Sequence, residues 1–256
     1  MTDVLLEETI DGVLRLTMNR PAAHNALNRE LASALATRIE AAGSEEGIRT
    51  IVLTGAGERT FCSGADLKEA GGRMFDRDEG ANPIAGVMRA MQACPKLVIA
   101  RINGSVLAGG LGLVAACDLA YAADHAKFGL PEVKVGVFPL MVSVPLMRQM
   151  PARRLAELAF LGEPFGAAEA ERYSIVNRVV LAADLDTVIA SVTDRIRLNA
   201  PGATAFGKKA LGELSALGIK DGLARAEAMI AELGAGAEAR EGRSAFADKR
   251  PPHWAR

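Results

Sequence analysis

The stretch VIARINGSVLAGGLGLVAACDLAYAADHAKFGLPEV, residues 98–133, decides the fold of this 256-residue chain. A β-branched apolar run over 97–102 predicts a buried strand, and small apolar residues over 111–116 predict a buried helix. Two glycine turns, Asn103-Gly104 and Ala108-Gly109-Gly110, lie between them. A glycine turn at a helix start presents backbone N–H groups that have no internal partner and that a ligand oxygen can approach closely. The stretch therefore has a geometry suited to binding a substrate oxygen.

Strands and helices are also predicted on both sides of this stretch. Before it we expect a hairpin of residues 4–10 and 12–18, a helix over 29–42 capped by Asn28, a strand over 50–54 and a helix over 83–93. After it we expect helices over 151–161 and 167–172, a strand over 175–180, and helices over 184–199, 202–217, 220–234 and 236–247. The change to almost wholly helical sequence predicts two parts, 1–195 and 196–256.

Composition excludes several classes of protein. The net charge of −1 gives no indication of nucleic-acid or membrane binding. Three cysteines without a CxxC pair predict reduced thiols in a cytoplasmic protein. The acidic start is unlike a signal peptide, and the longest uncharged apolar run, 104–117, is too short to span a bilayer. His24, His125 and His253 lack metal-ligand spacing, so we predict no metal site.

Two nucleotide-binding patterns are rejected. Residues 110–115 match GxGxxA, but Asp118 and Pro131 crowd the second strand that a dinucleotide fold requires. Close helix packing is the better explanation of these glycines. Residues 202–209 resemble a P-loop, but the final Ser/Thr is missing and a helical pattern precedes them.

Two carboxylates and one apolar segment each have two interpretations. Glu132, after a proline in an apolar context, is either an exposed turn residue or a carboxyl in a low-dielectric pocket. In the pocket its pKa would rise toward a value useful for proton transfer. Asp66 is better explained as the cap of a helix over 67–70 than as a site residue. The bulky segment 138–142 is either a pocket wall or core.

Six motifs, in order and over nearly the whole chain, resemble the crotonase, or enoyl-CoA hydratase/isomerase, family. They are NRP…NALN at 19–28, FCSGADL at 61–67, NG…AGG…CD at 103–118, FGLPE at 128–132, AEA…VNRVV at 168–180 and EG…AF…KR at 241–250. The resemblance implies an α/β fold, a crotonase-type spiral of ββα repeats with a C-terminal helical region that builds trimers or hexamers. It also implies acyl-CoA thioester substrates and no separate cofactor, because coenzyme A is part of the substrate.

The resemblance also implies a set of site residues. By position, the backbone N–H groups of Ala65 and Gly109 form an oxyanion hole for a thioester enolate, and Glu132 is the general acid/base. The implied substrate-binding residues are Ala26, Asp66, Leu67, Lys68, Gly110, Gly112, Phe138, Phe246 and Lys249. Of these, Lys249 and Lys68 match positions near the CoA phosphates, with Arg250 as an alternative to Lys249.

Gly112 departs from the family pattern, because hydratases of the family usually have a second glutamate there. Hydration commonly uses two carboxylates, whereas a double-bond shift needs one base, so Gly112 favours an isomerase while both reactions stay candidates. Two other classes are weighed: a non-catalytic acyl-CoA-binding protein and an RNA-binding member of the fold. The joint presence of Ala65, Gly109 and Glu132 argues against the first, and the near-neutral charge with few aromatic residues against the second.

Overall fold

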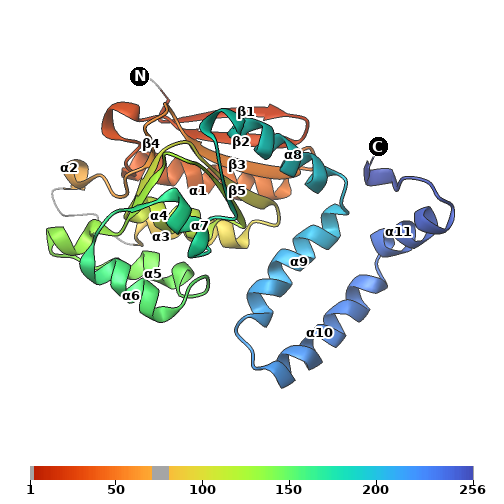
Figure 1. Cartoon of the computed structure of the whole chain (residues 1–256). Coiled ribbons are helices and arrows are strands. Elements are labelled where there is room, and N and C mark those ends of the chain that lie inside the picture. The colour runs from red at the N-terminus through yellow and green to blue at the C-terminus, as the bar shows by residue number, and fades with distance from the viewer. Residues whose placement is uncertain (1–2, 71–80, 256) are drawn as a thin grey trace.

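The computed structural model describes residues 3–70 and 81–255, which form a two-sheet body and a helical arm (Figure 1). The chain enters the body through β1 (Leu5–Ile10) and β2 (Val13–Met18), which pair antiparallel. Their turn places Asp11 and Gly12 at φ 48° and 78°. Positive φ at both central residues is what a type I′ hairpin turn needs, and Gly12 supplies it without a Cβ clash. The predicted hairpin is confirmed.

The main sheet has six strands in the order β1-β2-β3-β5-β7-β10, parallel from β2 onward. Its remaining members are β3 (Thr50–Gly55), β5 (Leu97–Ile102), β7 (Leu119–Ala123) and β10 (Arg178–Val180). The strand predicted over 175–180 begins only at Arg178. Asn177 N–H donates to Ala120 O at 2.8 Å, but Ala120 N–H donates to the Asn177 side chain at 2.7 Å, so the regular pairing of the strand starts at Arg178.

A second, smaller sheet was not predicted from the sequence. Its order is β4-β6-β8-β9, formed by β4 (Thr60–Cys62), β6 (Ser105–Leu107), β8 (Lys127–Gly129) and β9 (Phe165–Gly166). Strands of two or three residues are too short to show an alternating pattern, so they form only because the fold brings them together. The parallel strands β4, β6 and β8 end at one edge of this sheet, which positions the site described below.

Helices cover the sheets and close the core. They are α1 (Arg29–Ser44), α2 (Leu67–Ala70), α3 (Pro83–Ala93), α4 (Gly109–Ala116), α5 (Leu140–Leu146), α6 (Ala152–Leu161), α7 (Ala167–Arg172) and α8 (Leu185–Arg197). Asn28 caps α1 as predicted, since its Oδ1 accepts from Leu31 N–H at 2.9 Å. Helix α4 begins two residues before its predicted start, at Gly109. Helix α5 was not predicted, because its segment contains two prolines.

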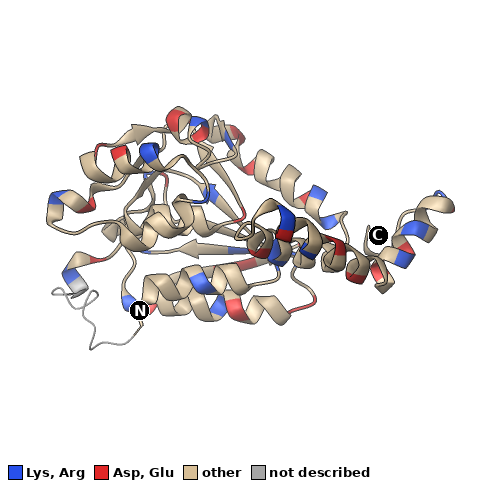
Figure 2. Cartoon of the chain, turned by 90° about the horizontal axis from the view of Figure 1, so that it is seen from below, with Lys and Arg blue, Asp and Glu red and all other residues tan. Residues whose placement is uncertain are grey.

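The chain ends in α9 (Pro201–Leu214), α10 (Ile219–Gly234) and α11 (Ala237–Ala247), which we call the arm (Figure 1). The arm extends away from the body (Figure 1 and Figure 2). The boundary between parts at 195/196 stays a prediction. Within the described residues, no helix is long and apolar enough to cross a membrane. No cluster of His, Cys, Asp or Glu in residues 3–70 and 81–255 has the arrangement of a metal site.

Candidate active site

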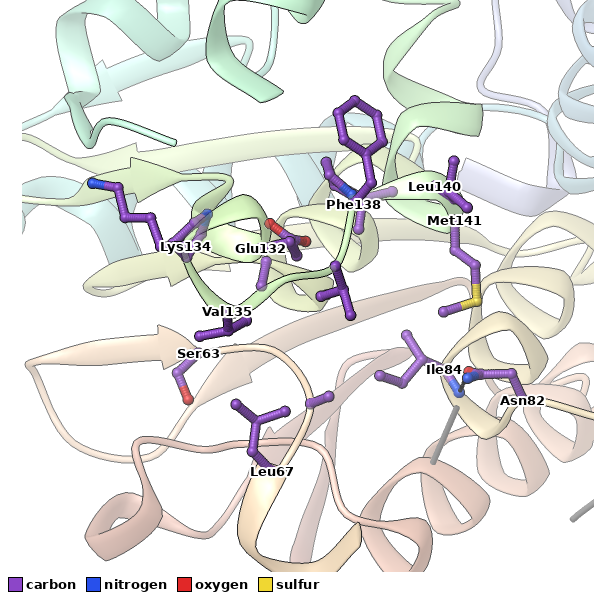
Figure 3. A pocket seen from close by; sticks show the side chains of 17 residues that line it. Ser63, Leu67, Asn82, Ile84, Glu132, Lys134, Val135, Phe138, Leu140 and Met141 are labelled. Carbon is purple, nitrogen blue, oxygen red and sulfur yellow. Dashed lines mark hydrogen bonds between the residues drawn. The ribbon is translucent and has the colours of Figure 1, made fainter. Parts of the chain in front are cut away.

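A cavity of about 670 Å³ lies where β4, β6 and β8 end (Figure 3). The segment after β4 contributes Ser63, Ala65 and Leu67, the segment after β6 contributes Ala108 and Gly109, and the segment after β8 begins at Pro131 and Glu132. The start of α3 and residues 134–142 complete the wall. Chain segments that are far apart in sequence meet here because the carboxyl ends of parallel strands share one edge.

The backbone segments that carry the Ala65 and Gly109 N–H groups are in contact beside this cavity. Leu27 N–H donates to Gly64 O at 2.7 Å and Asp66 N–H donates to Leu27 O at 2.9 Å, which holds the Ala65 backbone in place. A Cβ added to Gly109 would lie 3.7 Å from Ala65 N, so the two segments are in contact. Within the described part of the chain, neither the Ala65 nor the Gly109 N–H has a hydrogen-bond acceptor.

The backbone is strained just before Gly109. Ala108 has φ 49° and ψ −127°, a conformation that only glycine adopts easily, and such strain costs on the order of 1–3 kcal/mol. Gly64, with φ 93°, faces it; a Cβ there would lie 2.7 Å from Ala108 Cβ and 2.9 Å from Gly109 N. Because Gly64 has no Cβ, the segments that contain Ala65 and Gly109 can approach this closely.

Glu132 lies in a 3₁₀ turn, Pro131–Val135, that directly follows β8. Its carboxyl is in the cavity rather than on an exposed turn (Figure 3), and its Oε2 is buried with no hydrogen-bond partner among the described residues. Burial raises the pKa of Glu132 above its usual value, because the charged form loses water. A carboxyl with a raised pKa is a candidate for a group that accepts a proton and returns it.

The other residues predicted for the site differ in whether they line the cavity. Leu67 and Phe138 line the cavity. Asp66 lies beside it: Asp66 Oδ1 accepts from Lys68 N–H at 3.1 Å, which confirms the helix cap, and Oδ2 pairs with Arg20 at 2.8 Å. Phe246 and Lys249 lie on and just after α11 in the arm and do not line the cavity of their own chain.

The remaining predicted residues, Ala26, Gly110 and Gly112, are small and do not line the cavity. Ala26 is buried next to Leu27, the partner of the Ala65 segment. A Cβ at Gly110 would lie 2.4 Å from Cys62 O, so close packing of α4 on β4 explains this glycine, as expected. At Gly112 a Cβ would lie 2.2 Å from Met88 Cε and 3.2 Å from Val142 Cγ2.

Several cavity residues were not predicted individually. The segment 138–142 lines the cavity throughout, so the pocket interpretation of this segment is right. Ser63 belongs to the motif at 61–67 but was not assigned to the site. The residues that the sequence analysis missed are Asn82, Ile84, Lys134, Val135 and Val137. No motif marks them; only Asn82 carries a signal, as the cap of α3 through its contact with Ile84 N–H at 3.0 Å. Most of the lining is apolar, which suits a hydrocarbon chain.

The fold is that of the crotonase class of proteins, a class of mixed α/β chains. The model of the enoyl-CoA hydratase/isomerase family matches residues 8–256, and the chain belongs to that family. Carnitinyl-CoA dehydratase of Proteus mirabilis is 34% identical over 260 residues, covering 99% of each chain. The 2,3-dehydroadipyl-CoA hydratase of Escherichia coli is 34% identical over 247 residues, covering 94% of each. An enoyl-CoA hydratase crystal structure from Mycobacterium smegmatis superposes with a TM-score of 0.92 at 35% identity, covering 99% of each chain. The chain is therefore an enzyme of the hydratase/isomerase type.

Proposed function

We propose that the cavity binds an acyl-CoA thioester and stabilises its enolate, with Glu132 moving the proton. The thioester oxygen accepts hydrogen bonds from the N–H groups of Ala65 and Gly109. The observation that supports this most is their arrangement: two N–H groups without acceptors and a buried carboxyl oxygen without a partner share one cavity. Donors fixed before the reaction stabilise developing charge at no reorganisation cost, and one such donor contributes about 3–4 kcal/mol.

In a double-bond shift, the Glu132 carboxylate takes a proton from C2 of a 3-enoyl-CoA. The electron pair of that C–H bond moves into the thioester, and the resulting dienolate oxygen is held by the two N–H groups. Glu132 then returns the proton to C4, which leaves the double bond between C2 and C3. One carboxyl completes this cycle, because it serves first as base and then as acid.

The surroundings of Gly112 favour this reaction over hydration. Met88 Cε occupies the space where a side chain at position 112 would begin, and Val142 closes it from the cavity side. No carboxylate is therefore placed there to hold a water. Hydration of a 2-enoyl-CoA is the second candidate, supported by relatives whose names describe hydratases. It would need Glu132 alone to take a proton from water and deliver one to C2.

The arm supplies the rest of the proposed binding site in an assembly. Its exposed apolar side chains include Leu211, Ile219 and Phe246, with exposed fractions of 73%, 86% and 87%. We propose that they are covered in a trimer or hexamer, which also brings Phe246 and Lys249 near a CoA-binding site. Arg250 is a weaker phosphate ligand than Lys249, because Arg250 is already paired with Glu241 at 2.7 Å. We further propose that no separate cofactor takes part.

The test is Glu132→Gln, which replaces a carboxyl with an amide of nearly the same volume. We expect kcat on the best enoyl-CoA to fall by roughly 10²–10⁴-fold while affinity for a saturated acyl-CoA is kept. In the wild type, kcat for the double-bond shift should rise with pH as Glu132 loses its proton, with a midpoint above the usual glutamate range because burial raises its pKa. Glu163→Gln is the matched control, since Glu163 is exposed and pairs with Lys134, which lines the cavity. A Glu132→Gln variant that keeps more than a tenth of wild-type kcat would mean that the proposal is wrong.

A further inference from the structure

The two N–H groups of the proposed oxyanion hole belong to segments held together by very little regular structure. Ala65 follows β4 and Gly109 follows β6, and each of these strands has three residues. Their parallel register is also irregular, with a shift between Thr60 and Cys62. Because so short a ladder constrains position weakly, contacts outside it must contribute to the spacing of the two N–H groups.

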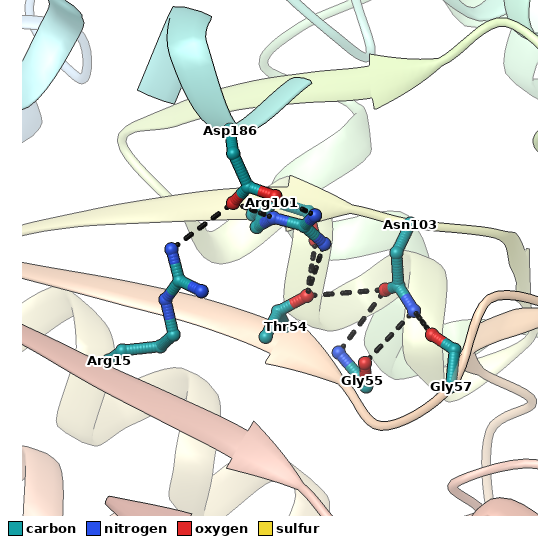
Figure 4. Close-up of polar contacts among 7 residues, drawn as sticks. All are labelled: Arg15, Thr54, Gly55, Gly57, Arg101, Asn103 and Asp186. Carbon is teal, nitrogen blue, oxygen red and sulfur yellow. Dashed lines mark hydrogen bonds and ion pairs between the residues drawn. The ribbon is translucent and has the colours of Figure 1, made fainter. Parts of the chain in front are cut away.

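The buried side chain of Asn103 joins the turns that lead into both strands (Figure 4). Asn103 lies between β5 and β6, and its amide reaches across to the end of β3 and the start of the loop to β4. Its Oδ1 accepts from Gly55 N–H at 3.3 Å and from the Thr54 hydroxyl at 3.2 Å. Its Nδ2 donates to Gly55 O at 2.9 Å and to Gly57 O. Both the oxygen and the nitrogen of this amide thus bond to one short segment, residues 54–57.

The backbones around this amide are in direct contact. A Cβ at Gly104 would lie 2.4 Å from the carbonyl carbon of Arg59, and a Cβ at Gly55 would lie 2.4 Å from Phe61 O. Ser105 N–H also donates to Arg59 O at 3.0 Å. Since the two turns touch without space between them, a displacement of one is passed to the strand that follows the other.

We propose that Asn103 is a positioning residue that sets the spacing between the Ala65 and Gly109 N–H groups. It does not reach the cavity, so it acts only through β4 and β6. An oxyanion hole depends on both donors lying within hydrogen-bond distance of one oxygen, and displacing a reacting group by about 1 Å can cost about a hundredfold in rate. This inference rests on the proposed function.

The hydrogen bonds around Asn103 continue through Thr54 and Arg101 to Asp186, which has a different role. Asp186 on α8 pairs with Arg101 at 2.7 Å and with Arg15 at 3.2 Å, and Arg101 Nη1 in turn contacts the Thr54 hydroxyl at 3.4 Å. Asp186 is more than half exposed and attaches α8 to the main sheet, at a distance from both turns (Figure 4). It provides a matched control within one connected set of hydrogen bonds.

The experiment compares Asn103→Asp with Asp186→Asn, since each exchanges an amide and a carboxyl of equal shape. Three quantities are measured: kcat, the Kd for a saturated acyl-CoA, and the near-ultraviolet absorbance of a bound β-ketoacyl-CoA, which reports its enolate. We expect Asn103→Asp to lower kcat at least tenfold and to remove the enolate absorbance, while the Kd changes less than threefold. Asp186→Asn should keep kcat within twofold and retain the absorbance.

The inference is overturned if folded Asn103→Asp keeps kcat within twofold, or if kcat and saturated acyl-CoA affinity fall by the same factor. If Asn103→Asp does not fold, Thr54→Val decides, because it removes the hydrogen bonds from the hydroxyl to the Asn103 amide and to Arg101 O and keeps the side-chain shape. A kcat loss of threefold or more at unchanged Kd supports the role of Asn103, and a smaller loss rejects it. Absence of the enolate absorbance in the wild type would instead reject the proposed function.

Discussion

The body and the arm bury their apolar residues to very different extents. In the body, long side chains such as Leu14, Ile51 and Phe61 are completely buried. In the arm, α9 has no buried apolar residue, α10 has only Met229 and α11 has only Ala245. The body is therefore stabilised by its own core and carries the cavity, whereas the arm has apolar surface that a single copy of the chain leaves in water.

A buried lysine connects these two regions. The Lys208 ammonium group on α9 pairs with Asp118 at 2.8 Å and donates to the carbonyls of Met91 and Lys96 at 2.8 and 2.9 Å. Its side chain is only 8% exposed. The P-loop-like pattern around Lys208 is thus part of a helix whose lysine binds carbonyl groups of the body. This contact is the most direct place to separate the arm from the body.

The largest effect is expected from Lys208→Ala. Removing one partner of a buried pair typically costs about 3–5 kcal/mol, because the remaining charge stays buried and unpaired. Burial already raises the pKa of Asp118, and Lys208 opposes that rise. Without Lys208 the folded-state pKa of Asp118 should rise further, so the loss of stability should be greatest above that pKa and shrink as acid protonates Asp118.

Urea unfolding at two pH values measures this effect. The control is Lys209→Ala, which removes the neighbouring, exposed lysine of the same helix and should change stability by less than about 0.5 kcal/mol. Equal, small losses for both variants would show that the arm is held to the body by other contacts.

The second expected effect concerns the assembly. Leu223 and Ile230 lie seven residues apart on one face of α10 and are 62% and 66% exposed. Replacing both with lysine should convert a trimer or hexamer into a smaller species, because the charges cannot be buried in a subunit interface. Ala228→Lys, which adds charge on another face of α10, should leave the assembly intact. Sedimentation of the wild type as a stable monomer at micromolar concentration would contradict the proposed assembly.

The smallest expected effect is a change of product ratio in Gly112→Glu. The new side chain must displace Met88 Cε, the mobile end of a side chain, and fit beside Val142, at a cost of roughly 1–3 kcal/mol in stability. A carboxylate there could hold a water, so we expect the ratio of hydrated to isomerised product to rise at least threefold. Gly112→Gln controls for size without charge. If both variants give the wild-type ratio, the missing carboxylate does not select the reaction.

The sequence predicts the long elements of both regions well, because their patterns are local. The helix over 83–93 and the strand over 97–102 have the bounds expected, and the arm helices lie within a few residues of their predicted positions. Periodicity and caps suffice for such elements. Periodicity gives no signal for strands of two or three residues such as β4 and β6, and the prolines in α5 argue against a helix that tertiary packing nevertheless forms.

The candidate site was predictable only in part, for a related reason. Glu132, Ala65 and Gly109 were identified through the family resemblance, and the structure places all three in one cavity. Residues such as Ile84 and Val137 are ordinary apolar residues, and only the folded chain shows that they line the cavity. Sequence spacing also could not show that Asn103 bonds to Gly55 and Gly57, since that contact joins two separate turns.

The central claim is that Glu132 in the body moves a proton on a thioester held by the Ala65 and Gly109 N–H groups. The most direct measurement incubates a 3-enoyl-CoA with the enzyme in D₂O and follows deuterium at C2 and C4 by NMR and mass spectrometry. The account predicts 2-enoyl-CoA formation with the wild type, with deuterium at C4 in those turnovers in which the Glu132 carboxyl exchanges its proton with D₂O before returning it. With Glu132→Gln it predicts that both are at least a hundredfold slower, although the variant still binds the ester. Incorporation at an unchanged rate in Glu132→Gln would contradict the account.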